Sequence, residues 1–248
     1  MDKEIQSLRH QRLTVFLMNL AYFAALLVVG VFLFIKGTTY GLVMVAVCAV
    51  FYLAVARPYT SRYKNSLRAA ILKASLGRSL ADYSYDPKSG TQRESVENAG
   101  LVNTRLSAFR SRELIRGRAG TIRAEAADVT FPIRENNLNT MFNGCFIGLD
   151  CPGARFEPTV VLAGELSELK LPARQKELLR EIGSLIPGSL YFHMDGERME
   201  FLLRGRFLGF RINPLVPVTE KLLCSDPLPE LHQAIQLARI GSGKLAQD

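Results

Sequence analysis

Acidic residues are absent from a long early stretch of this chain. Between Leu13 and Asp82 there is no Asp or Glu, and between Leu13 and Ala56 the only charged residue is Lys36. A helix of a soluble protein normally shows a polar face, and neither apolar run in this stretch has one. No small-x-small cleavage site follows the first run, which argues against a cleaved signal peptide. A signal peptide followed by a buried helix, and an apolar hairpin of a soluble protein, remain the alternatives.

Residues that bind metals or act as nucleophiles are scarce. The sequence holds four Cys and three His. Five residues separate Cys145 from Cys151, which matches no standard zinc motif, and only His193 and His232 accompany them. Residues 116–121 contain two glycines but lack the GK[ST] ending of a phosphate-binding loop. No metal, cofactor or catalytic constellation is therefore expected. Cys145 with His193 as nucleophile and base is an alternative without local support.

Two long apolar runs are the main feature that is present. Residues 13–35 and 41–56 are separated only by the short segment 36–40. About 20 apolar residues are needed for a helix to cross a bilayer, so these runs predict a transmembrane helical hairpin. Basic residues flank it at both ends, and such residues mark the cytoplasmic side. The sequence thus predicts a membrane protein with two transmembrane helices and both termini in the cytoplasm.

Four regions follow from this pattern: a cytoplasmic segment at residues 1–12, the hairpin at 13–56, a basic juxtamembrane helix at 57–80, and a cytoplasmic domain at 81–248. Arg57-Pro58 is expected to end or kink the second membrane helix. In the domain, strand and helix patterns alternate in a way typical of an α+β fold with a mainly antiparallel sheet flanked by helices. The elements expected there are a helix opened by a capping box at 91–94, a bulged strand at 120–133, a loop at 134–139, strands at 141–149 and 159–163, a helix at 172–185, a type I′ hairpin turning at Asp195-Gly196, a strand at 207–212, and a helix at 228–240.

The net charge of +8 is concentrated in two basic stretches. Residues 57–78 hold six basic residues and no acid, and residues 105–123 hold six arginines against Glu113. Such clusters attract anionic headgroups or acidic surfaces of partner proteins. Nucleic acid is not expected, because the arginines lack interleaved aromatic residues and no nucleic-acid motif is present. The candidate residues for a membrane-surface or partner-binding site are Arg57, Arg62, Lys64, Arg68, Arg110, Arg112 and Arg116.

The order of elements resembles the bacterial domain-of-unknown-function family 3137. The matching pieces are Tyr85 before a glycine-containing turn, Glu94, Gly100-Leu101, residues 113–117, residues 142–148, and the hairpin at 190–203. The resemblance implies a two-span inner-membrane protein with a cytoplasmic α+β domain, and it transfers no functional residue. Glu113 stands where the family pattern has an aspartate.

Together these features predict a non-enzymatic protein whose cytoplasmic domain docks a protein partner. It could serve as an accessory subunit of an envelope or secretion complex. A membrane-bound enzyme acting on lipid or peptide and an anionic-lipid sensor are the alternatives.

Overall fold

The computed structural model forms two compact units, one of Met1–Ser75 and Arg211–Ser225, the other of Leu76–Phe210 and Asp226–Asp248. The chain thus leaves the second unit once, after Phe210, and re-enters it at Asp226. The residues that the structure describes are 2–36, 38–101, 106, 108–135, 138–161, 171–208, 217–219, 222 and 226–242.

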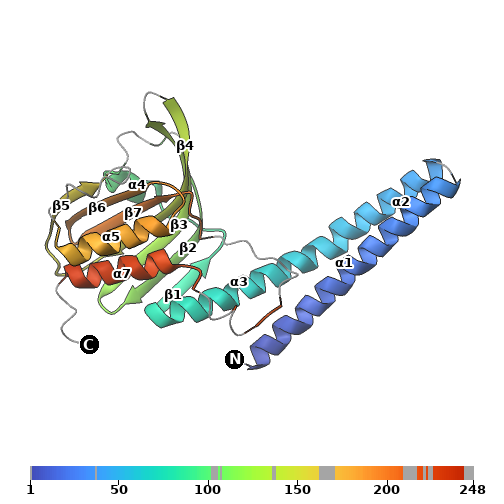
Figure 1. The fold of residues 1–248 in the computed structure, drawn as a ribbon, viewed down its shortest axis with the longest axis horizontal. Helices are drawn as coiled ribbons and strands as arrows, with labels where there is room; N and C mark the ends of the chain where they lie inside the picture. Colours follow the sequence, from blue (N-terminus) through green and yellow to red (C-terminus); the bar gives the residue numbers. More distant parts are fainter. Residues whose placement is uncertain are drawn as a thin grey trace. The chain divides into compact units, whose positions relative to one another are not determined.

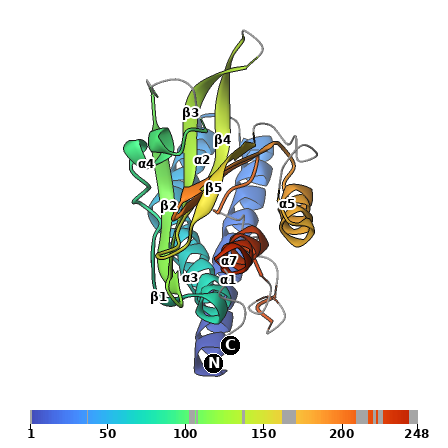
Figure 2. The ribbon, with the colours of Figure 1, turned by 90° about the vertical axis from the view of Figure 1, so that its left-hand side faces the viewer.

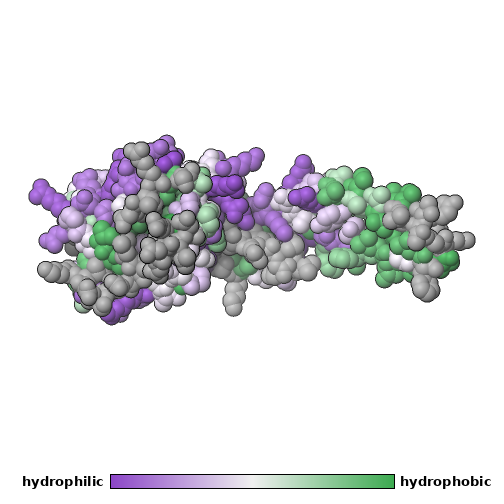
Figure 3. Space-filling view, turned by 90° about the horizontal axis from the view of Figure 1, so that it is seen from above, coloured by the Kyte–Doolittle hydropathy of each residue, from purple (hydrophilic) through white to green (hydrophobic). Residues whose placement is uncertain are grey.

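The first unit is built from two long helical paths (Figure 1). The first path, α1 (Asp2–Lys36), turns back into a second, and the rings of Tyr22 and Tyr52 meet with centroids 4.9 Å apart. Large apolar side chains on both paths are exposed, and hydrophobic surface gathers there (Figure 3). Both paths are long and apolar enough to cross a membrane. The second path consists of α2 (Thr38–Phe51), the π-helical turn η1 (Tyr52–Ala56) and α3 (Arg57–Ser79).

Pro58 does not end the second helix, so of the two sequence-based alternatives, an end or a kink, the structure excludes the end. The helical path runs through Pro58, and the wide turn η1 comes directly before α3. Proline lacks the N–H that an α-helix needs, and a π turn is one way in which a helix absorbs such a defect. The Thr60 hydroxyl adds a hydrogen bond to the Ala56 carbonyl at 2.8 Å.

The second unit contains a seven-stranded sheet in which all neighbouring strands are antiparallel. This confirms the predicted α+β class. The strand order is β1-β2-β3-β4-β7-β6-β5. The strands are β1 (Ala81–Asp86), β2 (Arg110–Ala119), β3 (Ile122–Glu135), β4 (Leu138–Asp150), β5 (Phe156–Val161), β6 (Leu190–Gly196) and β7 (Arg198–Arg204).

Helices cover both faces of this sheet (Figure 2). One face carries α5 (Ala173–Leu185) and α7 (Pro229–Gly241), and the other carries the short α4 (Arg93–Asn98). Both α5 and α7 confirm the sequence-based helices. Because α4 is short, it covers only part of its face, where a hydrophobic cluster includes the stacked rings of Phe131 and Phe142 with centroids 4.8 Å apart.

The predicted bulge lies in the wrong strand. The pairing of β3 with β4 is continuous, whereas the register of β2 shifts between Arg112 and Ile115. Within that shift, Glu113 has a φ of 60° and accepts a hydrogen bond from the Tyr85 hydroxyl. The change of alternation in β3 has another cause: its central residues are buried on both faces of the sheet.

Two turn predictions also need correction. Thr91 does not form a capping box on α4; its hydroxyl donates to Glu125 instead, and no side chain caps the helix. The β6–β7 hairpin is confirmed, but Asp195 pairs with Arg198, so Gly196 and Glu197 form the turn. Of these two, only Gly196 has a positive φ, 56°, which is the pattern of a type II′ rather than a type I′ turn.

Three segments differ in extent from the sequence-based expectation. Strands β3 and β4 extend into the expected loop, as far as Glu135 and from Leu138. Strand β5 begins earlier than expected, and residues 162–163 lie outside the described part. Residues 207–208 of the expected strand 207–212 are not in a strand, and the remainder of that segment lies outside the described residues.

Candidate binding hollow on the sheet

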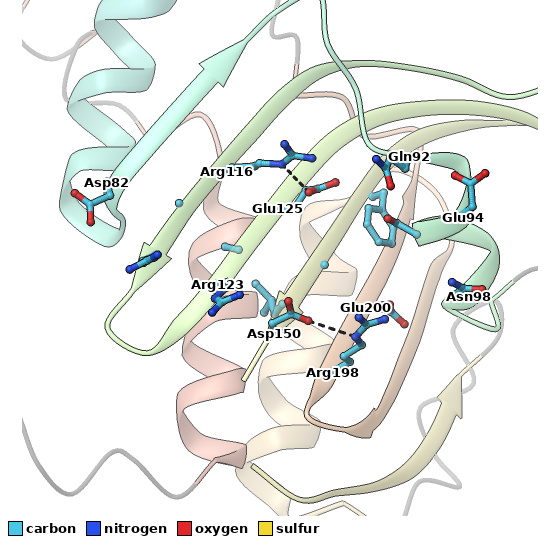
Figure 4. Close-up of a pocket in the computed structure, with 17 residues that line it drawn as sticks. Asp82, Gln92, Glu94, Asn98, Arg116, Arg123, Glu125, Asp150, Arg198 and Glu200 are labelled. Atoms are coloured by element: carbon cyan, nitrogen blue, oxygen red, sulfur yellow. Dashed lines mark hydrogen bonds and ion pairs between the residues drawn. The ribbon is translucent and has the colours of Figure 1, made fainter. Parts of the chain in front are cut away.

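A polar hollow of about 520 Å³ lies between α4 and the sheet (Figure 4). It occupies the part of the sheet face that α4 leaves uncovered. Charged side chains dominate its lining, and α4 contributes a polar wall of Gln92, Glu94, Ser95 and Asn98. From the sheet come Arg116, Gly117, Arg118, Arg123, Ala124, Glu125, Phe146, Gly148, Leu149, Asp150, Arg198 and Glu200, with Asp82 from β1.

Strand register places the charges in two rows, because directly paired residues point to the same face. The inner row runs through Arg116, Glu125, Gly148, Glu200 and His193. Its carboxylates are already engaged. Glu125 lies 2.8 Å from Arg116 and also accepts from a threonine hydroxyl. The buried Glu200 lies 3.0 Å from Nδ1 of His193.

The outer row lies next to the β2–β3 turn and runs through Arg118, Arg123, Asp150, Arg198 and Asp195. Asp150 stands between two arginines in register, and its carboxylate is 3.4 Å from Nε of Arg198. This row contains three arginines against two aspartates, so it is basic where the inner row is acidic.

Arg118 and Arg123 are directly opposite each other on β2 and β3. Both side chains are exposed, and neither pairs with an acid among the described residues. Like charges directly opposite across two strands destabilise a sheet. The pair therefore gives the hollow a basic rim, and neither arginine forms an ion pair with a residue that the structure describes.

The depth of the hollow depends on a glycine. Gly148 occupies the centre of the inner row, between Glu125 and Glu200 in register. A Cβ atom there would lie 3.2 Å from the ring of Phe146, which is buried in the floor. Any larger side chain at this position would fill the space between the two carboxylates.

The seven basic residues singled out from the sequence do not form one site. Arg57 and Arg62 are exposed on α3, and Lys64 and Arg68 on the same helix are partly buried; these four belong to the first unit. On β2, Arg110 and Arg112 pair in register with Thr130 and Asp128. Arg116, which follows the bulge, pairs with Glu125 and is the one of these seven residues that lines the hollow. Since Asp128 and Glu125 are three residues apart on β3, Arg112 and Arg116 belong to opposite faces.

The Cys145–His193 alternative is excluded by register. Cys145 pairs with Leu203, which pairs with Leu190. His193 is three residues from Leu190, so it points to the opposite face. Burial and the nearby charges of Asp128 and Glu230 raise the pKa of the Cys145 thiol well above its ordinary value. In the described part of the chain, no group of three His, Cys, Asp or Glu side chains is placed to hold a metal ion.

A buried charged cluster lies on the other face, beneath α7. Arg206, after β7, forms an ion pair with the buried Glu230 at 2.7 Å and donates to the Pro227 carbonyl at 2.6 Å. Asp128, also buried, accepts from the Leu208 amide at 2.6 Å. These contacts fasten the segment after β7 to the start of α7 and to β3. They lie on the sheet face opposite the hollow and link three segments of the unit.

Sequence reasoning missed the outer row. Arg116, Arg118, Arg123 and Glu125 alternate on either side of the turn at residues 120–121, and a two-residue turn there would have placed them on one face. The alternation therefore predicts that these four side chains share a face, provided that the segments before and after the turn are taken as two paired strands. Arg198 and Glu200 come from a distant hairpin, and only the pairing of β4 with β7 brings them to the same face.

Comparison of the chain with protein-family models, with curated proteins and with solved structures gives no match.

Proposed function

We propose that this chain is a membrane-anchored docking protein, whose hollow binds an acidic segment of a partner protein. The observation that carries the proposal is the arginine pair on the rim of the hollow, Arg118 and Arg123, which forms no ion pair with a described residue. Arginine binds carboxylates through paired, charge-assisted hydrogen bonds. An acidic segment would supply the negative charge that the rim lacks.

The charges of the inner row favour a short bound segment over a broad acidic surface as the ligand. Glu125 is held by Arg116 and Thr91, and Glu200 is held by His193. These contacts fix both carboxylates in the floor of the hollow, beyond the basic rim. A ligand with acidic residues at the rim and a basic or polar residue over the floor is complementary to this distribution of charge. Charge patterns of this kind govern partner choice and the rate of association.

The membrane placement is part of the proposal. It is supported by the two apolar helical paths and by the basic residues at their outer ends. We propose insertion in a bacterial inner membrane with both termini in the cytoplasm, as the resemblance to family 3137 implies. Reporters fused at Met1 and after Asp248 should both behave as cytoplasmic. Activity of a periplasm-dependent reporter at either end would contradict this topology.

Photo-crosslinking in cells tests the docking site. A photoreactive residue would replace Asn98, which lines the hollow from α4, and a control would replace Gln236, which is exposed on α7. The expected result is a protein adduct from position 98 and none from position 236. The adduct should disappear in the Arg118→Glu, Arg123→Glu background, and the crosslinked partner peptide should be rich in Asp and Glu. An adduct unaffected by charge reversal, or no adduct from position 98, would contradict the proposal.

A further inference from the structure

A second hollow, of about 610 Å³, lies within the first unit between α1 and α3. We call it the helix groove. The residues on α3 recur at helical spacing, so they form one continuous face of that helix. The lining residues are His10, Gln11, Thr14 and Val15 of α1 and Tyr59, Arg62, Tyr63, Asn65 and Ser66 of α3.

The charge of the helix groove is not neutralised by its own helices. His10 and Arg62 are exposed, and the structure shows neither side chain in an ion pair with a described residue. Between Glu4 and Asp82 the sequence has no acid at all. The segments of α1 and α3 that line the groove therefore supply no carboxylate to it.

Tyr63 provides an independent observation that points to a polar ligand. Its side chain lines the groove and is only 1% exposed, yet its hydroxyl is buried without a hydrogen bond to any described residue. Buried tyrosine hydroxyls usually find a partner, and an unpartnered one is unfavourable. An oxygen atom of a ligand at the groove floor would satisfy it.

The position of the groove indicates where that ligand comes from. Along α1 it lies at the end of the exposed apolar surface that begins with Leu13, Phe16 and Leu17. On α3 the exposed ring of Tyr59 lies at the same level. Tyrosine is enriched where membrane helices leave the hydrocarbon. The groove is therefore at the depth of lipid headgroups if the helices span a membrane.

We infer that the helix groove binds the phosphate headgroup of an anionic phospholipid. Arg62 holds the phosphate, His10 and the amide side chains surround it, and the Tyr63 hydroxyl donates to one of its oxygens. The acyl chains follow the exposed apolar surface of α1. This inference rests on the proposed membrane insertion but is independent of docking at the sheet hollow.

Native mass spectrometry of the full chain in a non-ionic detergent tests the inference. Phosphatidylglycerol and phosphatidylcholine would be titrated against wild type, Arg62→Gln, Tyr63→Phe, and the control Lys73→Gln, which changes an exposed basic residue of α3 outside the groove. We expect one tightly held phosphatidylglycerol on wild type. Binding should weaken about fivefold in Arg62→Gln, as for loss of one basic residue at a membrane surface. Tyr63→Phe should weaken it less, and Lys73→Gln should not weaken it.

Three results would contradict the binding of an anionic lipid headgroup at the helix groove. Equal loss in Lys73→Gln and Arg62→Gln would indicate general attraction to the basic surface. Equal affinity for the two lipids would remove the headgroup preference. Displacement of the lipid by inorganic phosphate at similar concentration would make the site a phosphate site rather than a lipid site. Release of wild type from membranes by alkaline carbonate would instead contradict the membrane insertion, so the two failures can be told apart.

Discussion

The two units of this protein treat charge in opposite ways. The long helices of the first unit carry basic residues with no acid between Glu4 and Asp82. The sheet unit pairs its buried charges, as Arg206 does with Glu230 and His193 with Glu200. Charges that a fold needs are compensated within it, because an unpaired buried charge is costly. Exposed arginines that form no ion pair with a described residue, such as Arg62, Arg118 and Arg123, therefore mark surfaces that meet something else.

The largest expected effect comes from removing one partner of a buried ion pair in the sheet unit. Arg206→Met would leave Glu230 buried without its partner, and we expect a loss of about 3 kcal/mol in the free energy of unfolding. The matched change in the other unit, Arg57→Met, removes no ion pair seen in the structure and should stay within about 0.5 kcal/mol. Denaturant unfolding of the full chain in detergent measures both.

The double variant Arg206→Met, Glu230→Met separates the lost pair from lost packing. Replacing both charges by apolar groups should restore part of the stability. A double variant as unstable as the sum of two singles would show that the ion pair is not the cause. Equal unfolding midpoints for Arg206→Met and wild type would remove the cluster beneath α7 as a stabilising feature.

The second effect concerns the thiol within that cluster. Burial, and then the nearby charges of Asp128 and Glu230, raise the pKa of the Cys145 thiol, so the protonated, unreactive form persists at mildly alkaline pH. The stability that this gives is fully present below the thiol pKa of the unfolded chain and falls as the pH rises above it. At pH 8 we expect alkylation of Cys145 to be about a hundredfold slower in the folded than in the unfolded chain.

Peptide-resolved mass spectrometry measures this rate for each cysteine separately. Arg206→Met should raise the rate at Cys145 by loosening the cover of α7. A rate in the folded chain equal to that of the unfolded chain would contradict the burial of this side of the sheet.

A smaller effect tests the β6–β7 turn. Gly196 has a φ of 56° and open space where a Cβ would be, so only the backbone conformation resists substitution. Gly196→Val should cost about 1 kcal/mol or more because β-branched residues resist positive φ. Gly196→Asn should cost clearly less, since Asn tolerates this region. Equal unfolding midpoints for the two variants would contradict the observed turn.

The smallest expected effect is a change in the free energy of unfolding, and its sign is the informative part. Arg118→Gln removes a like-charge contact across two strands and should stabilise the full chain by about 0.5 kcal/mol. Arg116→Gln removes an exposed ion pair with Glu125 and should destabilise it by about 0.5 kcal/mol. Stabilisation by removal of a residue that the partner needs would be typical of a binding surface. Destabilisation by Arg118→Gln would show that the pair is compensated within the domain.

The sequence predicts those features that depend on local patterns. The apolar runs of α1 and α2, the amphipathic helix α5 and the β6–β7 hairpin follow from composition and periodicity over short windows. The errors lie where long-range pairing overrides local preference. Thr91 donates to Glu125 rather than capping α4, and the bulge in β2 is held by a tyrosine from β1.

The candidate site was harder to predict for the same reason. Its rows of charge cross β2, β3, β4, β7 and β6, so they exist only once the strand order and register are known. The band of arginines in the sequence suggested a single surface, but the bulge in β2 places Arg112 and Arg116 on opposite faces. A shift of one residue in a strand reverses the faces of the side chains that follow, and nothing local in residues 110–116 specifies that shift.

Affinity purification of the full chain from native membranes tests the central claim most directly. Proteins that co-purify would be quantified for wild type, for Arg118→Gln with Arg123→Gln, and for a control with Arg174→Gln and Arg180→Gln, two exposed arginines of α5 that pair with no described acid. Loss of two arginine–carboxylate contacts is worth about 3 kcal/mol, so the rim variant should retain about a hundredfold less of its partner, and the control should retain it fully. Equal retention by the rim variant and the control would contradict the claim that the arginine pair on the sheet hollow is the docking site.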